Sequence, residues 1–255
     1  LTARPSIKDK KNVKHHLYGF LSVKKNFSTG QWLKLVKKKI KEIRERKKTP
    51  ILVGGTGLYF KSLTDGLVKI PHIPISFRKK IRLLQKKLGQ KKFFTKLKKI
   101  DPIYVSQIKP TDIQRSIRGY EVKFYTKKSL IEWFNETKPI FDKNSFMKLY
   151  INYPRKELIE RISKRSEQMV KEGVAKEVKK FLTIKVKEDI NSNKVIGVSE
   201  VKDYLDKTIG LETLKEKISI KTRQYAKRQS TWARGQMSNW QNLEPQDLKI
   251  FLKKI

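Results

Sequence analysis

Apolar residues recur along much of this chain every three or four positions, the spacing that predicts amphipathic helices. The clearest case follows Ser28, which is a favourable N-cap residue, and ends before Pro50. Its apolar stripe consists of Trp32, Val36, Ile40 and Ile43. We therefore predict a helix from about residue 28 to 48, with lysines covering its other faces.

A shorter apolar run, Ile51–Val53, lacks helical spacing and is typical of a strand covered on both faces. Gly54 and Gly55 follow it, so the backbone can turn sharply and approach a ligand closely. Thr56 then stands where a helix should begin, as a possible N-cap with a hydroxyl near the turn. Ligands of open α/β sheets bind at the carboxyl ends of strands. An ordinary tight turn between a strand and a helix is the alternative interpretation.

The region 71–143 has helical patterns only. We predict helices over 76–88 and 91–100, a short one between Pro102 and Pro110, one from Thr111, and one opened by a Ser129–Glu132 capping box. In the helix from Thr111, the residues expected to face inward are Ile113, Ile117, Tyr120 and Phe124. We predict an α/β core formed by residues 1–70 and 144–255, with residues 71–143 inserted as an all-helical domain.

Strand character returns at 146–153, and helical patterns follow from Pro154 onward. The last long helix is predicted over 211–235. Its expected buried stripe is Ile218, Thr222, Tyr225, Gln229 and Trp232.

The charge of the chain narrows the choice of partners. Lys and Arg number 62 against 24 Asp and Glu, a formal net charge of +38. This charge favours a polyanion, such as RNA, DNA or an anionic membrane surface, unless it reflects a general lysine bias. Cysteine is absent, which excludes disulfides and zinc–thiolate sites. No apolar stretch approaches membrane-spanning length.

Two polar segments could bind anions. In Gln114–Arg118 the arginines offer planar forks for phosphate and the glutamine could read a base edge, although a solvated basic face is an equal alternative. Lys221–Arg234 combines dense cations with aromatic residues, which suits a diphosphate or an RNA backbone. No Ser–His–Asp arrangement, carboxylate pair or metal-spaced cluster stands out. The pair His15–His16 is better explained by packing than by metal binding.

Taken together, five stretches resemble the bacterial tRNA dimethylallyltransferase, or isopentenyl-tRNA transferase, family. They occur in family order over nearly the whole chain. They are TARPS (2–6), HHL (15–17), LVGGTGLY (52–59), DIQRSIRGYEV (112–122) and TRQYAKRQSTWAR (222–234).

The resemblance implies transfer of a dimethylallyl group from dimethylallyl diphosphate to N6 of adenine 37 in tRNA. It implies a P-loop NTPase-like parallel-sheet core with a helical insertion that grips the anticodon stem-loop, and Mg²⁺ as cofactor. We expect a cytoplasmic monomer without membrane association.

Residue by residue, the resemblance makes Thr56 catalytic. The tRNA contacts that it implies are Arg78, Gln114, Arg115, Ser116, Ile117, Arg118, Arg223 and Gln224. The diphosphate contacts that it implies are Gly55, Lys194 and Arg223. Lys194 stands where some members have an arginine, and Val198 where a tyrosine is usual.

Family members carry a glycine-rich phosphate loop and an Asp that acts as general base, both before TARPS. This sequence starts at that point and lacks the loop, the Mg²⁺-binding hydroxyl and the Asp, so we expect it to be either a fragment or a truncated protein. Without them we expect these 255 residues to be inactive in prenyl transfer. The alternatives are a non-catalytic basic RNA-binding protein and a small-molecule kinase relative of the P-loop class.

Overall fold

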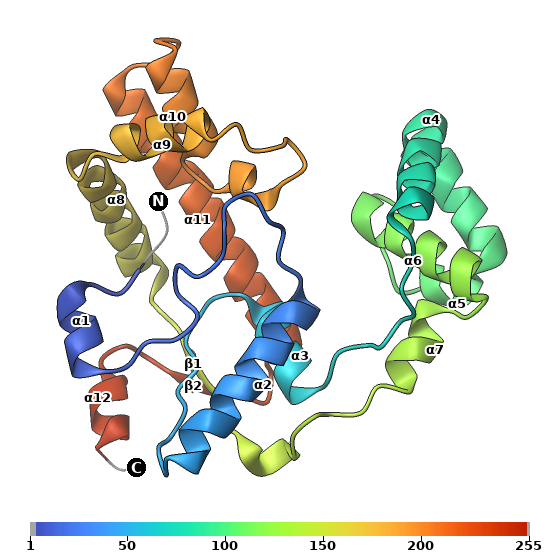
Figure 1. Cartoon of the computed structure of the whole chain (residues 1–255), viewed down its shortest axis with the longest axis horizontal. Helices are drawn as coiled ribbons and strands as arrows, with labels where there is room; N and C mark the ends of the chain where they lie inside the picture. The colour runs from blue at the N-terminus through green and yellow to red at the C-terminus, as the bar shows by residue number, and fades with distance from the viewer. Residues whose placement is uncertain (1–3, 254–255) are drawn as a thin grey trace. The chain divides into compact units, whose positions relative to one another are not determined.

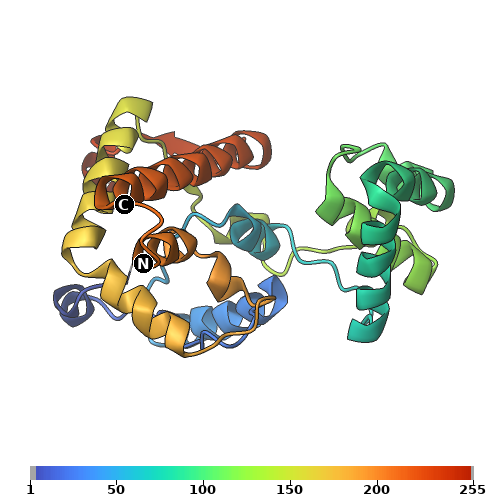
Figure 2. The same cartoon turned by 90° about the horizontal axis from the view of Figure 1, so that it is seen from above.

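The computed structural model describes residues 4–253 and divides the chain into two compact units. Unit 1 comprises Leu1–Phe60 and Phe146–Ile255, and unit 2 comprises Lys61–Ser145. Both are mainly helical (Figures 1 and 2). Helix α3 (Gly57–Thr64) carries the chain from unit 1 into unit 2.

In unit 1, α1 (Ile7–Asn12) and α2 (Thr29–Glu45) both start at capping boxes, at Ser6 and Ser28. The C-terminal part contains α8 (Arg155–Lys171), α9 (Val174–Thr183), the 3-10 helix η2 (Asn191–Lys194), α10 (Val198–Leu205), α11 (Leu211–Gln236) and α12 (Asp247–Leu252). Helices α9, α10 and α11 share an aliphatic core, to which α8 adds half-buried side chains. The buried residues of this core are Val174, Val178, Val201, Leu214 and Ile218. The predicted helices after Ser28 and from 211 are confirmed.

Among the described residues, β-structure is limited to two short parallel strands, β1 (Leu149–Ile151) and β2 (Gln241–Leu243). Leu149 pairs with Gln241 and Ile151 with Leu243. The strand predicted at 146–153 is therefore shorter than expected, and its partner was not predicted. The strand predicted at Ile51–Val53 is wrong for this structure, because the segment has no strand partner and Ile51 is 82% exposed.

A buried carboxylate joins α10 to α11. Glu200 is 2% exposed, accepts hydrogen bonds from the backbone of Gly197 at 2.7 Å and from Ser199 Oγ at 2.9 Å, and forms an ion pair with Lys221. Burial alone would raise the pKa of Glu200, but the hydrogen bonds from Lys221, Ser199 and Gly197 outweigh it and lower this pKa. Gly197 has φ +103°, a left-handed conformation that suits glycine at this turn.

Unit 2 is built on the packing of α4 (Ile75–Ile100) against α6 (Ile113–Thr126), with α5 (Pro102–Val105) and α7 (Leu130–Asn135) beside them. Helix α4 is interrupted at Gly89, whose φ is +70°, where the sequence predicts the end of one helix and the start of the next. The core includes Phe93, Leu97 and Val122, each without exposed surface. The 3-10 helix η1 (Lys143–Ser145) ends the unit.

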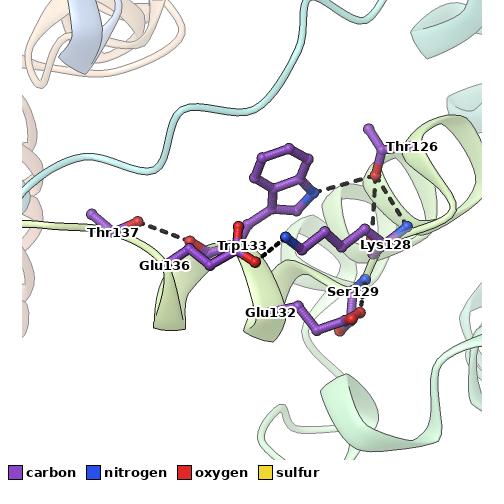
Figure 3. Close-up of polar contacts among 7 residues, drawn as sticks. All are labelled: Thr126, Lys128, Ser129, Glu132, Trp133, Glu136 and Thr137. Atoms are coloured by element: carbon purple, nitrogen blue, oxygen red, sulfur yellow. Dashed lines mark hydrogen bonds and ion pairs between the residues drawn. The ribbon is translucent and has the colours of Figure 1, made fainter.

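The end of α6 is fixed to α7 by polar contacts (Figure 3). Trp133 Nε1 donates to Thr126 Oγ1 at 3.3 Å, and the Lys128 ammonium lies 4.5 Å from the Trp133 ring centroid. Ser129 begins α7 with the predicted capping box, in which its backbone N–H donates to Glu132. Lys128 also pairs with Glu136.

Three predicted inward-facing positions are corrected by the structure. Ile113 and Phe124 of α6 are 43% and 47% exposed, and Tyr225 of α11 is 42% exposed. The other two predicted positions of α6, Ile117 and Tyr120, are buried, and the buried face also includes Ser116 and Glu121. Periodicity counted only apolar residues, so it did not predict that a serine and a glutamate occupy this face.

The Glu200 network predicts a pH-dependent stability. Because the pKa of Glu200 is lowered in the folded state, its contribution is present above its ordinary pKa of 4.5 and is lost as the pH falls through the lowered value. Glu200→Gln should reduce the free energy of unfolding by about 1–3 kcal/mol at neutral pH. Urea unfolding at pH 7 and below pH 4 measures this; a difference from the wild type that did not shrink in acid would contradict it.

Candidate functional site

The glycine turn before α3 lies directly against α11 in unit 1. A Cβ atom added to Gly55 would lie 2.1 Å from the side-chain amide of Gln229, and one added to Gly57 would lie 2.1 Å from the Trp232 ring. Such distances are shorter than contacts between non-bonded heavy atoms. At Gly57 the neighbour is a rigid ring, so glycine is required there, whereas at Gly55 the flexible Gln229 side chain can move. Thr56, between these two glycines, is exposed, and its carbonyl accepts from the backbone N–H of Tyr59 at 3.0 Å.

An aromatic pair holds the first turn of α3 on its other side. The rings of Trp32 on α2 and Tyr59 on α3 stack at 4.4 Å with an angle of 16° between their planes. The ring of Phe60 contacts Trp240 edge-on at 5.5 Å. The Thr56 turn is therefore held between α2, α11 and the segment after α11.

Beside Trp232, the surface of α11 forms a shallow, open cavity of about 420 Å³. It is lined by Gln224, Lys227, Arg228, Thr231 and Trp232. The Arg228 guanidinium lies 5.6 Å from the Tyr225 ring centroid, a cation–π contact that keeps it on the helix surface. A cavity with an aromatic wall and two cations can accept an apolar group joined to an anion.

The other predicted anion-binding residues of unit 1 lie on two elements, α11 and η2. Arg223 and Gln224 are exposed on the helix, and Lys194 is exposed at the end of η2. Lys194 precedes α10, which the Glu200–Lys221 ion pair joins to α11. The η2 region is tied in turn to the loop before α2, because Asn191 N–H donates to Asn26 at 2.9 Å and Ser192 Oγ to the carbonyl of Val23 at 2.7 Å.

In unit 2, the segment Gln114–Arg118 divides between core and surface. The side chains of Ser116 and Ile117 are buried, whereas Gln114 and Arg115 are exposed and Arg118 is half-buried. Ser116 Oγ donates to the carbonyl of Asp112 and accepts from Gln90 at 3.0 Å. Ser116 and Ile117 thus support the surface that the other three residues form.

A tyrosine fixes the backbone of this segment. The Tyr104 hydroxyl donates to the carbonyl of Arg115 at 3.3 Å, and its ring lies against Gly119, where a Cβ would be 2.2 Å away. Burial raises the pKa of Tyr104 to about 12, so the phenol stays protonated as a donor at neutral pH.

Arg78 on α4 and Arg118 on α6 both lie 3.4 Å from one carboxylate oxygen of Glu121. The two arginines were predicted from the sequence as separate contacts, and their common partner was not. Gln229 and Trp232 were also absent from the predicted site, although the spacing of three residues on the predicted helix places them on one face.

The described residues, 4–253, bring together no group of three or more His, Asp or Glu side chains able to hold a metal ion. No helix within 4–253 combines the length and the apolar character that crossing a membrane requires.

The model of the IPP transferase family matches residues 1–236, and the chain belongs to this family. It is 53% identical over all 255 residues to a tRNA dimethylallyltransferase of Pelagibacter ubique, covering 82% of that protein.

Solved structures agree with this assignment. A tRNA isopentenylpyrophosphate transferase of Staphylococcus epidermidis is 28% identical with a TM-score of 0.63, over 98% of this chain and 82% of that one. A eukaryotic dimethylallyltransferase acting on tRNA shares the fold, with a TM-score of 0.79, 24% identity and coverage of 96% and 63%.

The glycine contacts predict a graded mutational series. Gly57→Ala forces a methyl group against the rigid Trp232 ring and should cost about 1–3 kcal/mol in the free energy of unfolding. Gly55→Ala meets the flexible Gln229 side chain and should cost less. Gly54→Ala is the matched control, because no atom lies within 4 Å of its added Cβ. Urea unfolding of the three variants measures the order; equal losses would contradict the packing described.

Proposed function

We propose that this protein transfers the dimethylallyl group of dimethylallyl diphosphate to N6 of adenine 37, next to the anticodon of tRNA. The observation that carries the proposal is the 53% identity, over the whole chain, to a relative named tRNA dimethylallyltransferase. The strongly basic composition agrees with a tRNA substrate, since the net charge of +38 favours a polyanion.

The reaction is a nucleophilic displacement. The N6 lone pair of adenine forms a bond to C1 of the dimethylallyl group while the C1–O bond breaks, and diphosphate leaves with the electron pair. N6 then gives up a proton to a base, which we assign to no residue of this chain. Adenine 37 must be unstacked to reach the reacting carbon, as enzymes that act on bases generally require.

We assign Thr56 to the reaction centre, where its hydroxyl would hydrogen-bond to the reacting groups. Gly55, Lys194 and Arg223 would bind the diphosphate, since charge-assisted hydrogen bonds to phosphate are strong. The packing of the glycine turn around Thr56 on α11, the helix that also carries Arg223, supports this assignment.

The tRNA would be contacted by residues of three helices: Arg78 of α4; Gln114, Arg115 and Arg118 of α6; and Arg223 and Gln224 of α11. Ser116 and Ile117 would act from beneath the α6 surface. We further propose that the helical domain, predicted over 71–143, grips the anticodon stem-loop and that the α/β part is a P-loop-like core. The protein would act as a cytoplasmic monomer with Mg²⁺ as a cofactor.

The test is mass spectrometry of adenine 37 in tRNA from cells that lack the gene encoding this sequence. The prenylated adenine should disappear on deletion and return when the gene is restored. Prenylation that persisted at wild-type level after deletion would refute the proposed function.

The same cells test Thr56. Restoring the gene with Thr56→Ala should reduce the rate of prenylation about a hundredfold, because a hydrogen-bonding group at the reaction centre is lost. Thr56→Ser keeps the hydroxyl and serves as the control, with a loss below about tenfold. If Thr56→Ala prenylated tRNA at the rate of Thr56→Ser, Thr56 would have no catalytic role.

A further inference from the structure

We infer that Glu121 is a positioning residue: its buried carboxylate holds Arg78 and Arg118 side by side as one phosphate-binding cradle for RNA. The inference rests on the proposed function, because it specifies how unit 2 binds the tRNA. It concerns a residue that touches no substrate and acts only through the two arginines.

The burial of the Glu121 carboxylate does not favour the stability of the fold. Glu121 is 1% exposed, and one of its oxygens, Oε1, is buried without any hydrogen-bond partner. Taking a carboxylate out of water carries a large cost, and a buried carboxylate that lacks a partner at one oxygen recovers only part of it. An apolar or amide side chain would fill this position in a helix core at lower cost.

Both partners of Glu121 converge on its other oxygen. Arg78 Nε and Arg118 Nη1 each lie 3.4 Å from Oε2, and they come from different helices, α4 and α6. Arg78 Nε is itself buried and makes no hydrogen bond, so its contact is an ion pair only. One negative charge therefore faces two positive charges, which leaves a net charge of about +1 at this point.

The outer ends of the two guanidinium groups remain available. The Arg78 and Arg118 side chains are 41% and 40% exposed, respectively, while the carboxylate beneath them is 2% exposed. Each guanidinium carries five N–H donors in a planar fork, and the contact with Glu121 involves only one nitrogen of each. The remaining donors can bind a phosphate group bidentately.

Packing keeps the two helices in this register. Phe77, the neighbour of Arg78, stacks on Phe124 of α6 at 5.9 Å and contacts Tyr125 at 5.4 Å. The first turn of α4 is thereby held against α6, which brings Arg78 to the carboxylate of Glu121. The cradle is therefore preformed, which reduces the entropy lost when a phosphate binds.

The variant Glu121→Gln distinguishes a positioning role from a purely electrostatic effect, because the two predict opposite changes in tRNA affinity. Removing a negative charge should strengthen binding to a polyanion if charge alone matters. If Glu121 positions the arginines, the variant should bind tRNA about tenfold more weakly and lose about one unit of salt slope, log Kd against log salt. Fluorescence anisotropy with labelled tRNA over a salt series measures both.

The matched control is Glu136→Gln, which makes the same charge change in unit 2 at an exposed residue that pairs with Lys128. It should leave tRNA affinity unchanged or slightly raised. Glu121→Asp keeps the charge on a shorter side chain and should bind with an affinity between the wild type and Glu121→Gln. Glu121→Gln binding as tightly as Glu136→Gln would overturn the inference.

A second measurement leaves Glu121 in place, in case its replacement prevents folding. Arg78→Ala, Arg118→Ala and the double variant form a cycle in tRNA affinity. When one arginine is removed, Glu121 neutralises the other, so each single substitution should weaken tRNA binding strongly. The fold-increase in Kd of the double variant should then be at least about threefold smaller than the product of the two single fold-increases. Independent losses that multiply would contradict a shared carboxylate.

Failure of the inference is distinguishable from failure of the proposed function. A wild-type protein that binds tRNA, with a Glu121→Gln variant equal to it, rejects the cradle alone. A wild-type protein that does not bind tRNA at all rejects both.

Discussion

The close approach of α11 to a glycine turn is the constraint on which the candidate site depends. Helix α11 lies so near to Gly55 and Gly57 that a single methyl group would overlap Gln229 or Trp232. This contact sets Thr56 beside the helix that carries the cationic cavity, and the stacked pair Trp32–Tyr59 closes the other side. A side chain larger than hydrogen at Gly57 would press on the rigid Trp232 ring and push the turn that carries Thr56 away from α11.

Each unit also contains a buried glutamate that joins two helices through cations. Glu200 joins α10 to α11 through Lys221 and is fully hydrogen-bonded, so it serves stability. Glu121 joins α4 to α6 through two arginines and leaves one oxygen unpartnered, so its value lies in placing those arginines. In a chain with a net charge of +38, such carboxylates decide which cations are held in a defined position.

Much of the helical content could be predicted from the sequence, because capping residues and apolar spacing act locally. The predicted N-cap at Ser28, the predicted capping box at Ser129 and the break at Gly89 are present in the structure. The strand at Ile51–Val53 was wrong because a strand exists only with a partner, which apolar composition does not reveal. The buried face of α6 was predicted only in part, at Ile117 and Tyr120, because the partners of Ser116 and Glu121 come from α4, far away in sequence.

Only those residues of the candidate site that stand in short sequence motifs could be proposed from the sequence. Motifs indicated Thr56, Arg118 and Arg223, since short stretches carry the resemblance to the family. They did not indicate that Gln229 and Trp232 pack on the glycine turn, because that contact joins residues more than 170 positions apart in the sequence.

The most direct test of this account is a double-mutant cycle between Gly57 and Trp232. Gly57→Ala, Trp232→Leu and the double variant are compared by the rate of adenine 37 prenylation in cells lacking the chromosomal gene. The smaller leucine makes room for the added methyl group, so the double variant should be at least about tenfold faster than the product of the two single effects predicts. Effects that simply multiply would show that α11 does not position the Thr56 turn.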